Sequence, residues 1–370
     1  MRILYISSAQ SLGGGERHLA DLANGMVERG HDVYAVVRPD SPLINELKRI
    51  PESNVTGLAL RNALDARSAR ELARLVRTRD IQIVHAHMAR DYPMAAFAIR
   101  KNPNAKLIVT RHVLFALNPL HRITLSRAAR VIAVSQAAAG ELLNSKVATA
   151  EKITVVHNGI DVARFAKARI NFDREQFLRD WNLAKDSLLV GTVGELTPLK
   201  GHAEFLQAAA QVAPHFPNAY FLIAGTDHSL DKAHRLYLDE LIESLKLQDR
   251  VSIVEWLDDV AQLYCALDVF VSASHTESFG LAVAEAMACG TCVLATATGG
   301  AQEIIVPSET GRLVSLDDVR ELAEVLKELL GDGDERSRLG MAAQRSIAAR
   351  FSLEQMLDQT ERIYREELEA

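Results

Sequence analysis

The stretch VFVSASHTESFGLAVAEAMACG, residues 269–290, joins an apolar strand, a polar turn and an apolar helix. We expect the strand to end near Ser272 and the helix to begin between Ser278 and Gly280. The first amides of a helix have no partner within the helix and lie at its positive end, so such a junction favours phosphate. Glu277 precedes this junction and Glu285 follows it.

Carboxylates repel phosphate but accept hydrogen bonds from hydroxyl groups. A ligand with hydroxyls at both ends and phosphates between them would therefore suit this segment. A nucleotide diphosphate sugar has this form. The prediction places Glu277 on the sugar, Glu285 on the ribose diol and the amides of Phe279, Gly280 and Leu281 on the pyrophosphate.

Outward from this segment, short β-rich apolar runs alternate with helical stretches along most of the chain. Such alternation predicts βαβ units and a parallel sheet. The pattern pauses over residues 162–187, which are polar and helix-prone without a clear strand. We therefore predict an α/β protein of two doubly wound domains. The predicted strands cover residues 2–7, 32–37, 81–87, 106–110, 130–135, 153–159, 187–194, 219–225, 251–256, 269–274, 291–298 and 311–314.

Composition indicates a globular protein with no membrane-spanning segment. The chain has 370 residues, of which 48% are hydrophobic and 24% charged. No apolar run reaches the roughly 18 residues that a span needs, and the first residues read as a strand rather than a signal peptide. We expect a cytoplasmic protein. Cys289 and Cys292 form a C-G-T-C spacing, but with only Cys265 besides them, packing is favoured over redox chemistry or a zinc site.

Charge is distributed unevenly. Residues 1–165 carry a net charge of +9 and residues 166–370 carry −15. Residues 111–130 interleave Arg and His with large apolar residues, as interfacial membrane segments do. One predicted helix also carries an arginine stripe. These features predict peripheral contact with an anionic membrane, and the alternative is a solvated helix face with core residues. The stripe consists of Arg67, Arg70, Arg74 and Arg77.

Other strand ends also carry candidate binding residues, because ligands of doubly wound sheets bind beyond the carboxyl ends of the strands. Gly13, Gly14 and Gly15 precede a helix predicted to start at Glu16, which suits either a phosphate loop or a plain tight turn. Histidines follow the next strands in the sequences HAH, residues 85–87, and TRH, residues 110–112.

These motifs together resemble the retaining GT-B glycosyltransferases of family 4, also called group 1. The paired glutamates match the E-x(7)-E motif of that family. Supporting motifs are GGGE, HAH, TRH, NGID at 158–161, LKG at 199–201, IAG at 223–225, WLDDV at 256–260 and the terminal helix from residue 351. The resemblance implies two Rossmann-like domains facing a central cleft, with the last helix crossing back to the first domain. It assigns 1–167 plus 351–370 to the acceptor side and 168–350 to the donor side.

The family motifs also imply roles for single residues. His112 would hydrogen-bond the transferring sugar, Lys200 would neutralise the pyrophosphate, and Glu277 would complete the catalytic set. The remaining donor-binding residues by resemblance are Gly14, Gly15, Glu195, Gly225, Trp256, Leu257, Ser278, Phe279, Gly280, Leu281 and Glu285.

The resemblance implies a hexosyltransferase that retains anomeric configuration and needs neither cofactor nor metal. A UDP-sugar is the favoured donor. The acceptor would be a glycan or a lipid-linked glycan, in the synthesis of a cell-surface polysaccharide, lipopolysaccharide or glycolipid, and no nucleic acid is expected. The alternatives are a non-catalytic nucleotide-sugar-binding subunit and a GT-B epimerase or phosphorylase.

One residue departs from the family pattern. Where many members have an arginine ahead of the lysine, this chain has Glu195 in the sequence GELTPLKG. A carboxylate there does not contact pyrophosphate favourably at neutral pH. Either another cation, such as Arg17 or Arg111, supplies the missing charge, or donor affinity is weak.

Overall fold

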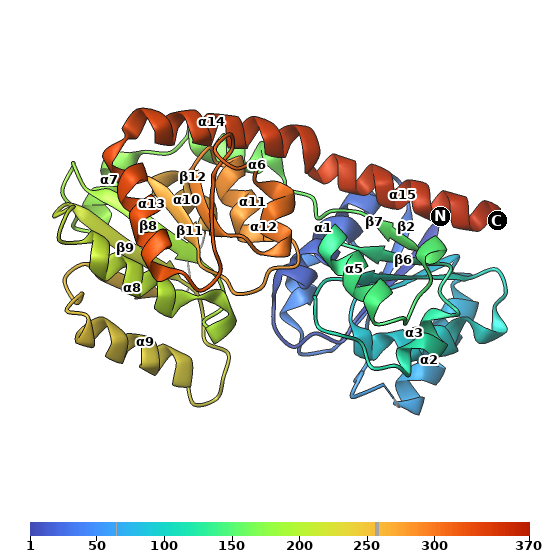
Figure 1. The fold of residues 1–370 in the computed structure, drawn as a ribbon. Coiled ribbons are helices and arrows are strands. Elements are labelled where there is room, and N and C mark those ends of the chain that lie inside the picture. Colours follow the sequence, from blue (N-terminus) through green and yellow to red (C-terminus); the bar gives the residue numbers. More distant parts are fainter. Residues whose placement is uncertain (64, 256–258) are drawn as a thin grey trace. The chain divides into compact units, whose positions relative to one another are not determined.

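A computed structural model describes residues 1–63, 65–255 and 259–370. The chain forms two compact units, each with its own parallel sheet (Figure 1). Unit 1 comprises Met1–Gly159 with Leu353–Ala370, and unit 2 comprises Ile160–Ser352. The predicted α/β class with two doubly wound domains is confirmed.

Unit 1 contains a seven-stranded sheet in the order β3-β2-β1-β4-β5-β6-β7. Its strands are β1 Arg2–Ser7, β2 Asp32–Val37, β3 Val55–Gly57, β4 Ile83–Ala86, β5 Lys106–Arg111, β6 Arg130–Ala133 and β7 Ile153–Val155. Its α-helices are α1 Gly14–Glu28, α2 Ala66–Thr78, α3 Tyr92–Ala98, α4 His121–Leu125, α5 Gln136–Asn144 and α15 Leu353–Glu369. Short 3-10 turns are η1 Pro42–Glu46, η2 Glu52–Asn54, η3 Ala89–Asp91, η4 Ile99–Lys101 and η5 Ala150–Lys152.

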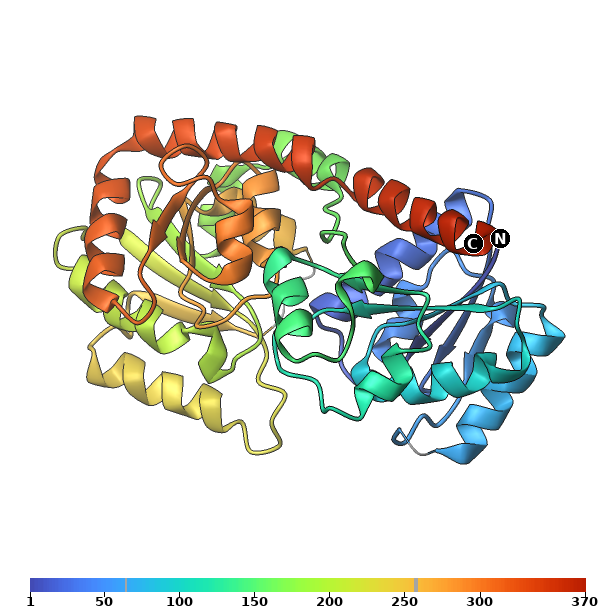
Figure 2. The ribbon, with the colours of Figure 1, turned by 45° about the vertical axis from the view of Figure 1, so that its right-hand side comes forward.

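Both faces of this sheet are buried, which explains why its strands are continuously apolar (Figure 2). Successive side chains of a strand point to opposite faces. In β1, Leu4 and Ile6 therefore join the core beneath α2 and α3, while Ile3 and Tyr5 join the core beneath α1 and α15. The strand order reverses between β1 and β4, where a sheet of this kind binds ligands.

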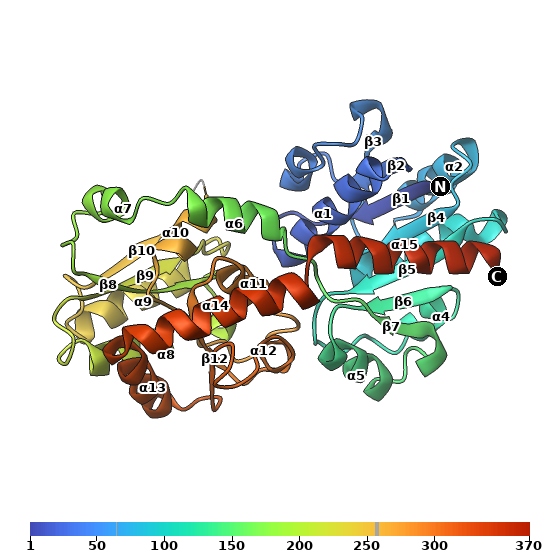
Figure 3. The ribbon, with the colours of Figure 1, turned by 90° about the horizontal axis from the view of Figure 1, so that it is seen from above.

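The C-terminal helix α15 packs on α1 in unit 1 (Figure 3). Met356, Leu357, Ile363 and Tyr364 are buried in the shared core. A Cβ atom on Gly25 of α1 would lie 2.5 Å from Leu357 Cδ1, so glycine permits the close approach. The prediction that the last helix returns to the N-terminal domain is confirmed.

Unit 2 contains a six-stranded sheet in the order β10-β9-β8-β11-β12-β13. Its strands are β8 Leu188–Val193, β9 Ala219–Ala224, β10 Val251–Val254, β11 Val269–Ser272, β12 Cys292–Thr296 and β13 Arg312–Val314. Its helices are α6 Val162–Ile170, α7 Arg174–Asp180, η6 Pro198–Lys200, α8 His202–Val212, α9 Ala233–Ser244, α10 Val260–Ala266, α11 Leu281–Ala288, α12 Gly299–Ile304, α13 Val319–Gly331 and α14 Gly333–Arg350. The strand order reverses between β8 and β11.

Two details differ from the sequence-based expectations. Residues 160–167 belong to unit 2 rather than to the first domain, and 351–352 also belong to unit 2. The reason is that α6 packs against α10 and α11 of unit 2. Strand β3 was not predicted, because it spans only Val55–Gly57 and none of its residues is buried.

Within the described residues, no helix combines the length and the apolar character needed to cross a bilayer.

Candidate active site

Two loops of unit 2 meet at the carboxyl ends of β8 and β11, where the strand order reverses. His275 N donates a hydrogen bond to Leu199 O at 2.9 Å, which ties the loops together. Gly201 has φ +68°, and a Cβ atom there would lie 1.9 Å from Ala273 O. The LKG motif therefore needs its glycine for this contact between the loops.

Lys200 and Glu277 form an ion pair at this meeting point. Lys200 Nζ lies 2.5 Å from Glu277 Oε1, and the same oxygen accepts a hydrogen bond from Ser274 Oγ at 3.1 Å. The exposed fractions of the two side chains are 31% and 16%. The pair thus places one cation and one carboxylate together, partly shielded from water.

Helix α11 begins at Leu281, one residue beyond the predicted range. Gly280 is its N-cap with φ +97°, a left-handed conformation that favours glycine. Ala284 N donates to Gly280 O at 3.0 Å, which closes the first turn. The turn before the helix, including Ser278 and the buried Phe279, carries Glu277 at the positive end of α11.

Glu285 lies within α11 and contacts α10. Glu285 Oε2 accepts a hydrogen bond from Tyr264 OH at 2.9 Å, and Tyr264 is fully buried. The tyrosine therefore fixes the direction of the carboxylate that the sequence predicts for the ribose diol.

The other predicted donor-binding residues have different surroundings. Glu195 is exposed. A Cβ atom on Gly225 would lie 1.8 Å from Gly194 O, so packing between the ends of β8 and β9 requires glycine there. Trp256 and Leu257 lie outside the described residues.

In unit 1, the glycine segment forms the start of α1. The helix begins at Gly14, not at Glu16 as predicted, so Gly14 and Gly15 lie in its first turn. Glu16 Oε2 accepts a hydrogen bond from Gly13 N at 3.0 Å. Burial raises the pKa of Glu16, and the amide of Gly13 and the charge of Arg90 oppose this shift. The helix start thus already has a carboxylate cap.

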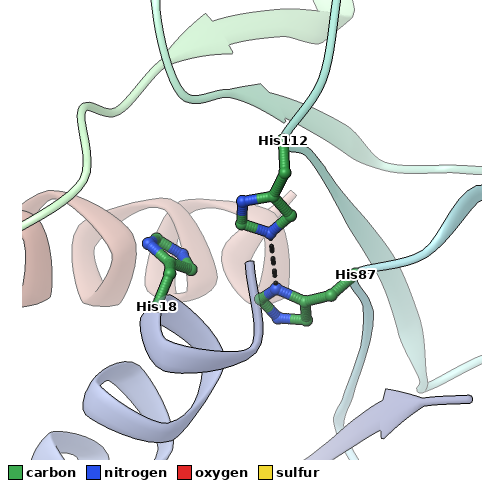
Figure 4. Close-up of side chains that lie close together, drawn as sticks. All are labelled: His18, His87 and His112. Carbon is green, nitrogen blue, oxygen red and sulfur yellow. Dashed lines mark hydrogen bonds between the residues drawn. The ribbon is translucent and has the colours of Figure 1, made fainter. Parts of the chain in front are cut away.

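His112 lies beside this helix start, in a cluster with two other histidines (Figure 4). A Cβ atom on Gly15 would lie 3.4 Å from His112 Cγ. His87 Nδ1 and His112 Nε2 are 3.1 Å apart, and the rings of His18 and His112 have centroids 4.9 Å apart. Burial lowers the pKa of His112 and of His87 well below the usual value, and that of His18 to about 4. The three rings are therefore neutral at pH 7.

A series of hydrogen bonds surrounds His85, which neighbours this histidine cluster. His85 Nδ1 lies 2.5 Å from Tyr364 OH of α15, and His85 Nε2 lies 2.7 Å from Thr110 Oγ1. The rings of His85 and His87 have centroids 4.2 Å apart. Thus the last helix contacts the HAH motif directly and is linked to Thr110 of the TRH motif through His85.

Several contacting residues were missed by the sequence reasoning. These are His18, Ser274, Tyr264 and Gly300. Gly300 N donates to Glu277 O at 3.0 Å, and a Cβ atom there would lie 2.5 Å from Phe279 O. A double glycine directly after the strand at 291–298 was the available signal for Gly300. No comparable local signal marks His18 and Tyr264, because their partners are distant in sequence, whereas Ser274 lies three residues before its partner Glu277.

The predicted cysteine assignment is consistent with the structure. Cys265, Cys289 and Cys292 are buried free thiols. Burial raises the pKa of Cys292 to about 12. A buried protonated thiol is inert, which supports packing as its role.

The fold and these loops define a glycosyltransferase of the GT-B class. The family described as Glycosyl transferases group 1 matches residues 173–346, and the family described as Glycosyltransferase Family 4 matches residues 12–164. The chain belongs to the group 1 glycosyltransferases of family 4, and it is an enzyme of this class.

Two proteins with named activities are similar in sequence to this chain. The chain is 26% identical to the N-acetyl-alpha-D-glucosaminyl L-malate synthase of Bacillus anthracis, over 97% of this chain and 95% of that protein. It is 33% identical to the D-inositol 3-phosphate glycosyltransferase of Salinispora tropica, over 60% of this chain and 47% of that protein. The second match therefore spans about half of that relative's length.

Solved structures share the fold over the whole chain. A glycosyltransferase from Rickettsia africae superposes with a TM-score of 0.89 and 25% identity, covering 99% of this chain and 98% of that chain. The Anabaena protein HepE, crystallised with UDP and glucose, gives a TM-score of 0.84 and 23% identity, covering 98% of both chains. At 23% identity, the similarity to HepE shows a shared fold alone.

Proposed function

We propose that this protein is a retaining glycosyltransferase that transfers a hexose from a UDP-sugar to a glycan or a lipid-linked glycan. The ion pair between Lys200 and Glu277, at the start of α11, is the observation that carries this proposal. It combines a cation for the diphosphate, helix amides for its oxygens and a carboxylate for sugar hydroxyls.

Five of the predicted groups have roles in this proposed reaction. Lys200 and the amides at the start of α11 stabilise negative charge on the departing diphosphate. Glu277 and His112 hydrogen-bond the transferring sugar, and Glu285 binds the ribose diol. The bond between the anomeric carbon and the phosphate oxygen breaks while the acceptor oxygen bonds to the same face of that carbon. The acceptor proton passes to the departing phosphate oxygen, so no metal and no nucleophilic side chain are needed.

The choice of UDP draws support from proteins of similar fold. HepE was crystallised with UDP, with UDP and glucose, and with UDP-glucose, and a TarM variant was crystallised with UDP. The acceptor class draws support from a Staphylococcus aureus relative named as a capsular polysaccharide biosynthesis glycosyltransferase, 26% identical over 68% of this chain. We infer a place in the synthesis of a cell-surface polysaccharide, lipopolysaccharide or glycolipid.

Contact with an anionic membrane is part of the proposal. In the segment 111–130, Phe115, Leu120 and Ile123 are 61%, 70% and 65% exposed. The arginine stripe lies on the exposed face of α2, while Leu72 and Val76 of that helix are buried. Exposed apolar side chains in a basic unit suit the interface of an anionic membrane, where a lipid-linked acceptor would be found.

A donor screen tests the proposed reaction. Thermal unfolding is measured with UDP, GDP, ADP and their common sugar conjugates, followed by product analysis of turnover with the stabilising donor. We expect UDP and one UDP-sugar to raise the unfolding temperature, and the product to keep the anomeric configuration of the donor. Inversion at the anomeric carbon would refute retention, and stabilisation by GDP or ADP alone would refute the donor.

Two alternative activities have distinct signs. A non-catalytic binding subunit would bind a donor without turnover, whereas an epimerase or phosphorylase would consume donor without acceptor or depend on free phosphate. The family assignment favours the transferase over both.

A further inference from the structure

Three histidines of unit 1 converge from separate elements. His18 belongs to α1, His87 follows β4 and His112 follows β5 (Figure 4). One ring nitrogen from each lies within 4.8 Å of the other two. Among the residues that the structure describes, this is the one group of three metal-ligating side chains within that distance.

The nitrogen positions suit a small metal ion. His87 Nδ1 and His112 Nε2 are 3.1 Å apart. Two nitrogens bound to one tetrahedral zinc ion, at about 2.0–2.1 Å each, would be about 3.3 Å apart. The third ligand would require His18 to approach by up to about 1.5 Å.

An unsatisfied ring nitrogen provides a second observation. His18 and His87 are 4% and 6% exposed, and His18 Nδ1 has no hydrogen-bond partner. Buried polar atoms without a partner are rare, and a bound ion is one explanation for them. The rings are neutral imidazoles, which is the form that binds metal.

We propose that His18, His87 and His112 bind one divalent transition-metal ion such as zinc. Three imidazoles would leave a fourth position for water. The ion would bind the ring nitrogen of His112, and His112 is the histidine proposed to contact the transferring sugar. Bound metal is therefore an inhibitor, not a cofactor. Metal binding does not depend on the proposed function, whereas inhibition rests on it.

The first test measures binding without donor or acceptor. Purified, chelator-treated protein is titrated with zinc against a chromophoric chelator, and with Co²⁺ by visible spectroscopy. We expect one zinc ion per chain and the intense absorption of tetrahedral Co²⁺, with at least tenfold weaker zinc binding in His18→Gln. The matched control is His215→Gln, which removes an exposed histidine of unit 2 and should bind as the wild type does.

A measurement on the wild-type protein does not depend on whether a variant folds. X-ray absorption of the zinc-loaded protein should show imidazole scattering without sulfur. Sulfur scattering, absence of stoichiometric binding, or unchanged affinity in folded His18→Gln would overturn the metal site.

The second test addresses inhibition. Transferase activity should fall as zinc is added and return with EDTA, and half-inhibition of His18→Gln should need at least tenfold more zinc. Stoichiometric zinc binding at the histidines without inhibition would leave the metal site standing and would overturn the assignment of His112 to the sugar. Activity that requires zinc would overturn the inhibitory role.

Discussion

Lys200 and Glu277 pair at the carboxyl end of the unit 2 sheet, with Lys200 Nζ 2.5 Å from Glu277 Oε1. The family motifs assign these residues to different parts of the donor. Their pairing means that the lysine positions the carboxylate before a donor binds, while the carboxylate holds the lysine near the start of α11.

Removing either partner should slow transfer. Glu277→Gln keeps the shape but removes the charge, and Lys200→Met removes the cation. We expect each to lower kcat by about 10²- to 10³-fold, a usual cost for loss of one group that stabilises transition-state charge. The double variant should lose less than the product of the two factors, because the residues act on each other.

Steady-state kinetics with circular dichroism of each variant checks this prediction. Lys185→Met is the control, since this lysine is 82% exposed and pairs with Glu175. Wild-type turnover in folded Glu277→Gln would contradict the assignment.

Glu285 should determine nucleotide binding together with Tyr264. Glu285→Ala is expected to abolish the thermal stabilisation given by UDP. Tyr264→Phe removes the hydroxyl that holds Glu285 Oε2, so we expect nucleotide affinity to weaken several-fold while kcat changes little. Isothermal titration of both variants separates these effects. If Glu285→Ala binds UDP as tightly as wild type, the ribose contact is wrong.

Glu195→Arg should strengthen donor binding. The carboxylate is exposed at a position where the family has a cation, so the change exchanges repulsion of phosphate for attraction. Of the two substitute cations, Arg111 is buried and donates to Phe115 O, whereas Arg17 is exposed. Titration calorimetry with nucleoside diphosphates is expected to show tighter binding. Equal or weaker binding would refute the placement of Glu195.

Neutralising the arginine stripe should weaken binding to anionic liposomes. Each basic side chain near such a surface contributes about 1 kcal/mol, so four Arg→Gln changes at 67, 70, 74 and 77 should lower the partition coefficient at least tenfold. Co-sedimentation measures this effect. A variant with Gln at four other exposed cations should retain most of the binding, and unchanged sedimentation of the stripe variant would exclude its role. These control positions are Lys48, Arg49, Arg320 and Arg362.

Buried histidines should make the protein less stable in mild acid. Burial lowers the pKa of His18 from 6.5 to about 4 and has the same effect on His202. Between these pH values the unfolded chain binds more protons than the folded one, so unfolding takes up protons. Their contribution is fully present above pH 6.5 and is lost as the pH falls towards 4.

Each such histidine should lower the free energy of unfolding by about 3 kcal/mol as the pH falls across that range. Urea unfolding at a series of pH values should show the decline, and His18→Gln should reduce its slope. A slope in this variant equal to that of wild type would show that His18 does not titrate in this way.

The sequence by itself determined the alternation of strands and helices, because the local pattern of hydrophobic residues differs between the two. It also determined the loop-to-helix junction at Glu277 and the helical character of 162–187, where polar residues dominate. It failed for β3, whose three partly exposed residues carry too little apolar pattern.

Only the tertiary structure decided which strand ends become neighbours. Pairing of β8 with β11 brings Lys200 to Glu277, and pairing of β4 with β5 brings His87 to His112. The contacts of Tyr264 with Glu285 and of Tyr364 with His85 likewise join distant segments. Strand order depends on long-range packing across the sheet, so local periodicity does not encode it.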